Sequence, residues 1–423
     1  MEYRRRVVDD ELDELMASLA AVALEGPKAV GKTETALQRA ATVHRLDDPG
    51  QEALIRADPS RIVAGRPPVL IDEWQRVPQT WDVVRRAVDE DPSPGRFLLT
   101  GSASPTDRTA HSGAGRIVPV RLRPLSLAER GVTSPTVSCR ELLGGERVPL
   151  GGASDVGLEQ YAAEIVGSGF PGLRNLSGRA LRAQLDGYLD RIVDRDFEEL
   201  GHPVRRPSAL RRWLAAYAAA TSTTTSYEKI RDAATSGQGD KPAKTTTIPY
   251  RDVLERLWVI DAVPAWLPTR NHLSRLSAPP KHHLADPALT ARLLGVGVGA
   301  LLDAHPAGSS AGRNATLLGQ LFESLVTLDV RAYAQSAEAT VKHLRTWAGE
   351  HEIDLIVVRD DHRVVAVEVK LAQTVDDRDV RHLKWLAGEI GDDLLDAIVV
   401  TCGPYAYRRP DGIGVVPAAL LGP

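Results

Sequence analysis

In the first 130 residues, short apolar runs alternate with stretches whose apolar positions recur every three or four residues. The first pattern is typical of buried strands and the second of amphipathic helices. The predicted strands are residues 21–25, 43–47, 68–72, 96–100 and 117–122, and the predicted helices are residues 8–19, 32–41 and 79–90. Strands that are apolar on both faces favour a parallel sheet covered by helices. We therefore predict an α/β domain with a parallel sheet over residues 1–138.

The pattern changes after Pro124. Residues 139–157 contain many glycines and predict a linker, because glycine favours loops. Residues 158–285 then have mainly helical periodicity, with a strand-like run at 258–260. Several helices followed by a hairpin-like stretch are the order of a winged helix-turn-helix. We therefore predict a helical and winged-helix region over residues 158–285.

The last third of the chain alternates helices and strands again. The predicted helices are residues 319–333 and 379–390, and the predicted strands are residues 340–346, 354–359, 364–370 and 397–401. This order indicates a second α/β domain, which we place at residues 286–423.

Composition excludes several classes of protein. The chain has 423 residues and a net charge of −4, so no overall charge draws it to nucleic acid or to an anionic membrane. Two cysteines cannot build a disulfide framework or a Cys-based zinc module. No apolar run reaches the length of a membrane span, and the N-terminus lacks the apolar core of a secretion signal. We therefore expect a cytoplasmic protein that does not bind membranes.

The strongest chemical signal is a glycine-containing loop between the first predicted strand and the helix that follows it. Its spacing, Gly-x-x-x-x-Gly-Lys-Thr, is that of a P-loop, in which backbone N–H groups surround phosphate oxygens. Lys32 is expected to reach the β- and γ-phosphates of ATP, and Thr33 to bind Mg²⁺. The predicted ATP-binding residues of this loop are Gly26, Pro27, Lys28, Ala29, Val30, Gly31, Lys32 and Thr33.

Polar side chains at the ends of later strands complete a predicted hydrolysis site. Asp72 is expected to bind ATP through Mg²⁺, and Glu73 to polarise the attacking water. Thr100 ends another strand, where it can sense the γ-phosphate or simply cap the strand. Arg116 offers a catalytic cation for the charge of the transition state, in cis or from a neighbouring subunit. A surface ion pair explains Arg116 equally well.

Together these motifs resemble a widespread prokaryotic family of AAA-like ATPases. The resemblance rests on residues 26–33, 72–78, 99–102, 115–116 and 123–130. It implies a P-loop ATPase domain, a winged-helix region and a C-terminal domain similar to restriction-type nucleases. Trp74 departs from the smaller aliphatic residue of many members, which changes packing beside the site and not its chemistry. The resemblance indicates which domains the protein contains and leaves its physiological role open.

Four polar residues in the last third fit a metal-dependent nuclease. Glu368 and Lys370 are two apart on a predicted strand and so face the same side. Asp354 can join Glu368 in holding Mg²⁺ or Mn²⁺, and Glu323 can add a ligand. Lys370 can then orient the attacking water. The pattern resembles the PD-(D/E)XK nucleases, although Ile353 stands where their proline would be. The alternative is a relic fold without activity.

The middle region contains basic residues that could contact the phosphates of a duplex. They are Lys241, Lys244, Arg251 and Arg256, and a second group is Arg205, Arg206, Arg211 and Arg212. Asp252 and Glu255 interrupt the first group, and winged helices also serve as packing elements. DNA binding by this region therefore competes with a purely structural role.

These observations leave two functions open. The leading prediction is an ATPase whose cycle controls a C-terminal nuclease-like domain that acts on DNA or RNA. The alternative is a nucleotide-dependent switch, or a toxin or defence component, whose C-terminal domain docks a regulatory protein without catalysis. An Arg116 that acts between subunits would require a homo-oligomer.

Overall fold

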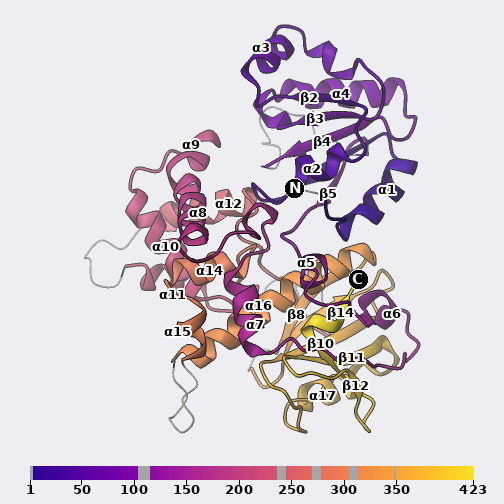
Figure 1. Cartoon of the computed structure of the whole chain (residues 1–423), viewed down its shortest axis with the longest axis vertical. Coiled ribbons are helices and arrows are strands. Elements are labelled where there is room, and N and C mark those ends of the chain that lie inside the picture. The colour runs from indigo at the N-terminus through magenta and orange to yellow at the C-terminus, as the bar shows by residue number, and fades with distance from the viewer. Residues whose placement is uncertain (1–2, 103–114, 236–243, 269–277, 304–312, 347–348) are drawn as a thin grey trace. The chain divides into compact units, whose positions relative to one another are not determined.

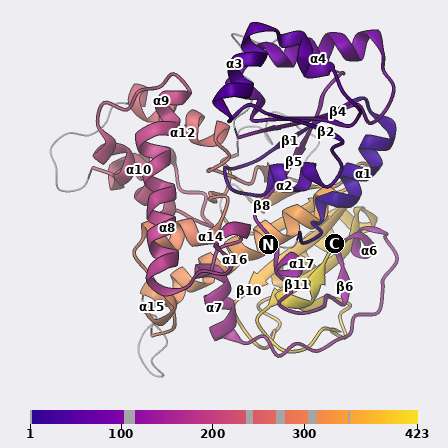
Figure 2. The same ribbon diagram turned by 45° about the horizontal axis from the view of Figure 1, so that its top comes forward.

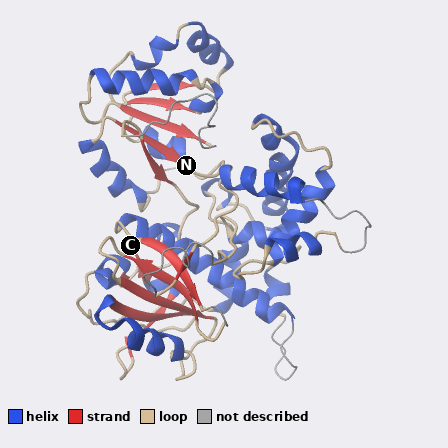
Figure 3. Cartoon of the chain, turned by 180° about the vertical axis from the view of Figure 1, so that it is seen from behind, coloured by secondary structure: helices blue, strands red, loops and turns tan. Residues whose placement is uncertain are grey.

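The protein is described by a computed structural model that covers residues 3–102, 115–235, 244–268, 278–303, 313–346 and 349–423 (Figure 1). Its internal contacts divide the chain into two compact units. The first unit contains residues 1–123 together with residues 254–259, and the second contains residues 124–253 and 260–423. Figure 3 shows that the strands gather into separate sheets and that the middle of the chain is helical.

The first unit is built on a five-stranded sheet in which all neighbouring strands are parallel. The strand order is β2-β3-β4-β1-β5. The strands are β1 (Ala21–Glu25), β2 (Thr42–Arg45), β3 (Val69–Asp72), β4 (Phe97–Gly101) and β5 (Val118–Arg121). The predicted parallel α/β sheet is therefore confirmed.

Helices cover both faces of this sheet (Figure 2). Helices α3 (Pro49–Ala57) and α4 (Gln79–Glu90) lie on one side, where Trp81 and Ile55 pack against alternate strand residues such as Ile71 and Leu99. Helices α1 (Val8–Ser18) and α2 (Lys32–Leu37) contact β1 on the other side. Two short 3₁₀ turns, η1 (Pro59–Val63) and η2 (Trp74–Arg76), complete the unit.

The middle of the chain is helical, as predicted. Its helices are α7 (Leu158–Val166), α8 (Gly178–Arg191), α9 (Phe197–Glu199), α10 (Pro207–Ala219), α11 (Tyr227–Ala233), α12 (Lys244–Arg256), α14 (Pro287–Leu293) and α15 (Val298–Leu302), with short turns η3 (Pro171–Leu173) and η4 (Ile192–Asp196). The strand predicted at 258–260 does not form: Trp258 has a φ of 60°, and only Ile260 makes an isolated bridge, to Leu284. The winged-helix assignment stays a prediction.

A second, mixed sheet forms the C-terminal domain. Its order is β12-β13-β11-β10-β9-β8-β7, with β9 antiparallel to both of its neighbours and β11 parallel to β10. The strands are β7 (Ala265–Trp266), β8 (Thr340–Arg345), β9 (Glu352–Val358), β10 (Val364–Lys370), β11 (Leu394–Thr401), β12 (Tyr407–Arg408) and β13 (Gly414–Pro417).

Helices pack on this sheet from several parts of the sequence. Helix α17 (Arg381–Ile390) contributes Leu383 and Leu386 to the core, and α16 (Arg313–Ser336) and α6 (Cys139–Leu143) also contact the strands. The remaining turns are η5 (Gly391–Asp393) and η6 (Ala418–Leu420). Even the long α16 is not apolar enough to cross a bilayer, and the same holds for every other helix among the described residues.

The predicted linker, residues 139–157, begins with the helix α6 (Cys139–Leu143). Strand β6 (Val137–Ser138) pairs with β14 (Leu421–Gly422), and α6 follows it directly. Residues 124–138, which the sequence assigned to the first domain, therefore group with the second unit. The domain limits given above stay predictions.

The segment that follows β5 is anchored in α16. It forms the short helix α5 (Leu127–Arg130), which begins with a capping box of Ser126 and Glu129. The N–H of Leu127 donates to Oδ1 of Asp329 at 3.0 Å, and the N–H of Ala128 donates to the Tyr333 hydroxyl at 3.3 Å. The polypeptide that leaves the first sheet is thus fixed to a helix of the C-terminal domain.

Asp329 makes the stability of this anchor depend on pH. Burial raises the pKa of Asp329 to about 8, although the charge of Arg130 and the N–H of Leu127 oppose the change. A folded chain that holds this proton is stabilised fully below about pH 4, and the stabilisation is lost as the pH rises through about 8. We expect the free energy of unfolding of the second unit to fall over that interval by up to about 1.4 kcal/mol per pH unit. Its melting temperature should fall with it.

The variant Asp329→Asn tests this expectation. The amide oxygen can still accept from Leu127 N–H but does not titrate, so the profile of melting temperature against pH should flatten in part. The exposed Asp360→Asn is the matched control and should follow the unmodified chain. Parallel profiles for all three proteins would refute a buried, protonated Asp329.

Candidate functional site

The predicted P-loop connects β1 to α2 and has the local backbone that a phosphate cradle needs. Gly31 has a φ of 103° and Ala29 a φ of 64°, both in the left-handed region. At Gly26, an added Cβ would lie 2.2 Å from the carbonyl oxygen of Leu122, so only glycine fits. The loop therefore passes close to the end of β5 before it turns into the helix.

Lys32 lies folded over this loop. Its ammonium group is buried and donates to the carbonyl oxygens of Gly26 and Pro27, both at 2.9 Å. Burial lowers the pKa of Lys32 to about 8, the charge of Arg121 adds to the effect, and Glu73 and Asp72 oppose it. Phosphate oxygens in the loop would take over these hydrogen bonds and keep the ammonium charged.

The Asp72 carboxylate accepts hydrogen bonds from two other predicted ATP-site residues, Thr33 and Thr100. Its Oδ1 accepts a hydrogen bond from the Thr33 hydroxyl at 2.7 Å and another from the Thr100 hydroxyl. The parallel register explains this, because Asp72 of β3 lies beside Thr100 of β4. Hydroxyl and carboxylate oxygens are the ligands that Mg²⁺ prefers, so Thr33 and Asp72 fit a magnesium ion held with ATP phosphates.

Glu73 follows directly and has a strained backbone. Its φ of 57° is unusual for a residue with a side chain and is typical of functional positions. Oε1 accepts from the Ser102 hydroxyl at 3.3 Å, and Oε2 accepts from the side-chain amide of Gln75. Its negative charge also opposes the lowering of the Lys32 pKa. Glu73 is therefore held at the end of β3 beside Asp72, and its role as the base for water stays a prediction.

Two arginines near β5 bear on the predicted site, Arg116 and Arg121. Nε of Arg116 lies 2.7 Å from the carboxylate of Asp89 on α4, and both side chains are partly exposed. This is the surface ion pair that the sequence left open, and a catalytic role of Arg116 stays a prediction. Arg121, which sequence reasoning missed, ends β5 beside Glu25, and its charge acts on Lys32. Its guanidinium lies 3.7 Å from the ring centroid of Trp258.

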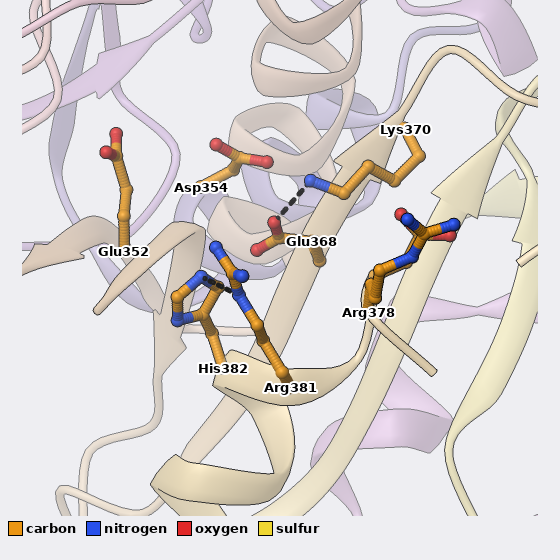
Figure 4. Close-up of a pocket in the computed structure, with 8 residues that line it drawn as sticks. Glu352, Asp354, Glu368, Lys370, Arg378, Arg381 and His382 are labelled. Carbon is orange, nitrogen blue, oxygen red and sulfur yellow. Dashed lines mark hydrogen bonds and ion pairs between the residues drawn. The ribbon is translucent and has the colours of Figure 1, made fainter. Parts of the chain in front are cut away.

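In the C-terminal domain, three of the four predicted nuclease residues border a cavity of about 380 Å³ (Figure 4), and Glu323 is not among its lining residues. The lining residues are Glu352, Asp354, Glu368, Lys370, Arg378, Asp379, Arg381 and His382. Glu368 and Lys370 point toward each other, with Nζ 2.7 Å from Oε1. Burial raises the pKa of Glu368 to about 8, and the charge of Asp354 adds to the effect. No described residue donates a hydrogen bond to its buried Oε2.

The other two predicted ligands meet a residue that the sequence did not single out. The ammonium group of Lys281 lies 2.9 Å from Oε1 of Glu323 and 2.9 Å from Oδ1 of Asp354. It also lies 3.6 Å from Oε1 of Glu352. We call these four side chains the lysine-centred cluster. Burial alone would lower the pKa of Lys281, but the charges of Asp354 and Glu323 outweigh it and raise the pKa.

This arrangement does not fit the predicted metal site. Lys281 supplies the positive charge between Glu323 and Asp354, and Oδ2 of Asp354 accepts the backbone N–H of Val369 at 2.9 Å. Oε1 of Glu368 is taken by Lys370. Among the residues that the structure describes, no three His, Cys, Asp or Glu side chains are placed to hold a metal ion. A metal shared by Glu323, Asp354 and Glu368 would have to displace Lys281.

Three stretches of the chain match models of known protein families. Residues 19–130 match the AAA domain. Residues 158–299 match a domain of unknown function (DUF8612), and residues 318–421 match another (DUF4143). The AAA domain therefore contains the P-loop, Asp72, Glu73 and Thr100, together with Arg116 and Arg121. The predicted AAA-type P-loop ATPase domain is confirmed, whereas no finding shows that the C-terminal domain is a nuclease.

Similar proteins add little about function. Uncharacterized proteins of Mycobacterium tuberculosis and Mycobacterium bovis are each 28% identical over 314 residues, which are 72% of this chain and 63% of the relative. The chain thus spans less than two thirds of their length. A solved Walker-type ATPase of Pyrococcus abyssi has a TM-score of 0.39 and 18% identity, covering 67% of this chain and 94% of that chain.

Three of the basic residues of the middle region, Lys244, Arg211 and Arg251, pair with acids. Nη2 of Arg211 lies 2.8 Å from Asp190, and Nζ of Lys244 lies 2.8 Å from Glu228. Arg251 pairs with its neighbour Asp252 at 3.1 Å. Lys241 lies outside the described residues. Binding of DNA by this region stays a prediction, because phosphates would have to compete with these ion pairs.

Proposed function

We propose that the chain is an ATP-hydrolysing switch, in which the nucleotide state of the AAA domain controls the C-terminal domain. The observation that carries the proposal is the Asp72 carboxylate, which binds the hydroxyls of both Thr33 and Thr100 behind the P-loop. One group thereby links the residue expected at Mg²⁺ to the residue expected at the γ-phosphate.

The chemistry follows from the positions of the side chains. Lys32 and the N–H groups of the loop would hold the phosphates of ATP. Thr33 and Asp72 would hold Mg²⁺, which would supply positive charge at the phosphate oxygens. Glu73 orients the attacking water and accepts its proton. Thr100 can exchange its hydrogen bond with Asp72 for one with the γ-phosphate, so its position reports whether that phosphate is present. The expected cofactors are therefore ATP and Mg²⁺.

A continuous route supports control of the C-terminal domain. Strand β5 borders the P-loop at Leu122 and leads within a few residues to α5, which Asp329 of α16 binds. The same helix carries Glu323, whose carboxylate accepts from Lys281. A shift of β5 on hydrolysis would therefore act on α16 at Asp329, six residues from Glu323 of the lysine-centred cluster. Such contiguity motivates coupling, and only measurement establishes it.

The first test is Lys32→Ala in the full chain. Loss of the ammonium removes the main cationic contact with the β- and γ-phosphates, so we expect ATP turnover to fall by at least about 10²-fold. Phosphate release measured with Mg²⁺ and ATP checks this. Lys384→Ala removes an exposed lysine of α17 and should leave turnover unchanged. Equal turnover in Lys32→Ala and the unmodified chain would refute hydrolysis at this P-loop.

Metal-dependent cleavage of DNA or RNA is the second candidate. The order helix, three strands, helix, strand from α16 to β11, with Asp354, Glu368 and Lys370 at one cavity, favours it. Cleavage with Mg²⁺ or Mn²⁺ that is lost in Lys370→Ala would support this function. No cleavage, combined with nucleotide-dependent capture of a regulatory protein that Lys32→Ala abolishes, would support the switch.

A further inference from the structure

We propose that Lys281 is the resident cation of the lysine-centred cluster and keeps divalent metal ions out of it. The inference concerns the C-terminal domain and holds whether or not the AAA domain hydrolyses ATP. It rests on the contacts of one side chain, on the rigidity of the backbone that carries it, and on the way in which the nearby carboxylate oxygens are already used.

The ammonium group of Lys281 is surrounded by acids. An ammonium has three N–H donors, and three carboxylates lie around it, those of Glu323 and Asp354 at 2.9 Å and that of Glu352 at 3.6 Å. The Lys281 side chain is 1% exposed, so water does not share its donors to any extent. The ammonium group of Lys281 thus makes the contacts that a bound cation would make among these carboxylates.

The backbone of Lys281 holds that position firmly. Its N–H donates to the carbonyl oxygen of Val263, and the N–H of Val263 donates to the Lys281 carbonyl, both at 2.9 Å. Two residues earlier, the carbonyl of Pro279 contacts Nε2 of His343 on β8 at 3.1 Å. Lys281 therefore enters the cluster from a paired segment, and it cannot leave by a simple rotation of an exposed side chain.

The remaining oxygens do not make a metal site around Lys281. Mg²⁺ and Mn²⁺ require several oxygen ligands in close contact, and a second cation among the same carboxylates would be repelled by the ammonium. Oδ2 of Asp354 is held by Val369, and Oε2 of Glu352 lies 3.1 Å from Arg345. A divalent ion could bind only after Lys281 is removed.

The consequence is a specific arrangement of charge in the cavity. Lys281 neutralises the Glu323 and Asp354 side, while Lys370 neutralises Glu368. The cluster then stabilises the fold without metal, and chemistry that requires a metal ion between these carboxylates is blocked in this conformation. The C-terminal domain therefore acts as a binding element unless its Lys281 segment moves.

Binding of Mn²⁺, followed by electron paramagnetic resonance without nucleotide, tests the proposal. The full chain with Lys32→Ala serves as the starting protein, so that the P-loop contributes no strong metal site. We expect no Mn²⁺ bound at the cluster while Lys281 is present. Adding Lys281→Ala should create one Mn²⁺ site. Its affinity should be at least about tenfold higher than that of any Mn²⁺ binding to the protein that keeps Lys281, a change of the size that altered ligand shells produce. Adding Glu323→Gln as well should abolish that site.

The opposite results would overturn the proposal. Binding of Mn²⁺ to the protein that keeps Lys281, with loss of that binding in Asp354→Asn, would show that the ammonium does not exclude metal. A folded Lys281→Ala variant that gains no site would show that the carboxylates are not a latent metal site. If Lys281→Ala does not fold, the titration of the protein that keeps Lys281, with and without Asp354→Asn, still decides whether metal is excluded.

Discussion

Replacement of Lys281 by methionine is expected to lower the free energy of unfolding of the second unit by about 3–5 kcal/mol. Methionine keeps the length and the apolar stem of the side chain but removes the ammonium group. Glu323 and Asp354, whose side chains are 15% and 13% exposed, would then be largely buried carboxylates without a cation. The cost of leaving such charges unpaired is much larger than the gain from forming an exposed pair. Thermal and urea unfolding of the full chain measure the effect.

Lys384→Met is the control for this experiment. Lys384 lies 2.8 Å from Asp411, a distance close to those of Lys281, but its side chain is 45% exposed. Its loss should cost less than about 1 kcal/mol. The effect of Lys281→Met should be largest above about pH 8 and should shrink below it, because burial raises the pKa of Glu323 to about 8 and a protonated Glu323 needs no cation. Equal losses in the two variants, at every pH, would contradict a buried charge cluster.

Glu73→Gln is expected to reduce the kcat of ATP hydrolysis by about 10²–10⁴-fold while ATP still binds. Glutamine keeps the shape and can retain the contact with Ser102, but it cannot accept the proton of the attacking water. Steady-state phosphate release gives kcat, and equilibrium binding of a fluorescent ATP analogue shows that the P-loop is intact.

Glu52→Gln is the matched control for Glu73→Gln. Glu52 lies on α3 of the same domain and pairs with Arg56 at 2.8 Å, away from the P-loop. It should hydrolyse ATP at the rate of the unmodified chain. If Glu73→Gln keeps that rate too, the base for hydrolysis is another group. If it loses ATP binding, Glu73 supports the loop rather than the chemistry.

The meeting of the predicted ATP-site residues could be foreseen from the sequence, because the parts of the site are local. Gly26 to Thr33 are contiguous, and Asp72 and Thr100 each end an apolar strand, so a parallel sheet brings them to one edge. The helix α3 escaped prediction, since Pro49 and Gly50 at its start indicate a loop when Asp48 is not known to cap it. Arg121 was missed because its strand alone does not show that it borders the P-loop.

The lysine-centred cluster could not be predicted in the same way. Lys281 is 42 residues from Glu323 and 73 residues from Asp354, so no spacing along the chain connects them. The sequence analysis expects a cation at Glu323 and Asp354, but assigns that role to Mg²⁺ or Mn²⁺. Nothing in the run Pro-Pro-Lys-His-His indicates that its lysine is fully buried. Only the tertiary arrangement distinguishes a charged loop residue from one at the centre of a cluster.

Residues 254–259 belong to the first unit although they are distant from it in the sequence. This affects which fragments of the protein can fold alone. Leu254, Leu257 and Val259 are buried, and Trp258 covers Arg121 beside the P-loop. A recombinant fragment cut after residue 123 would lack these side chains and expose the apolar surface that they cover, which favours aggregation. An inactive or insoluble ATPase fragment would therefore report the missing peptide rather than a faulty P-loop. Supplying residues 254–259 in trans, or on a tether, should restore its solubility.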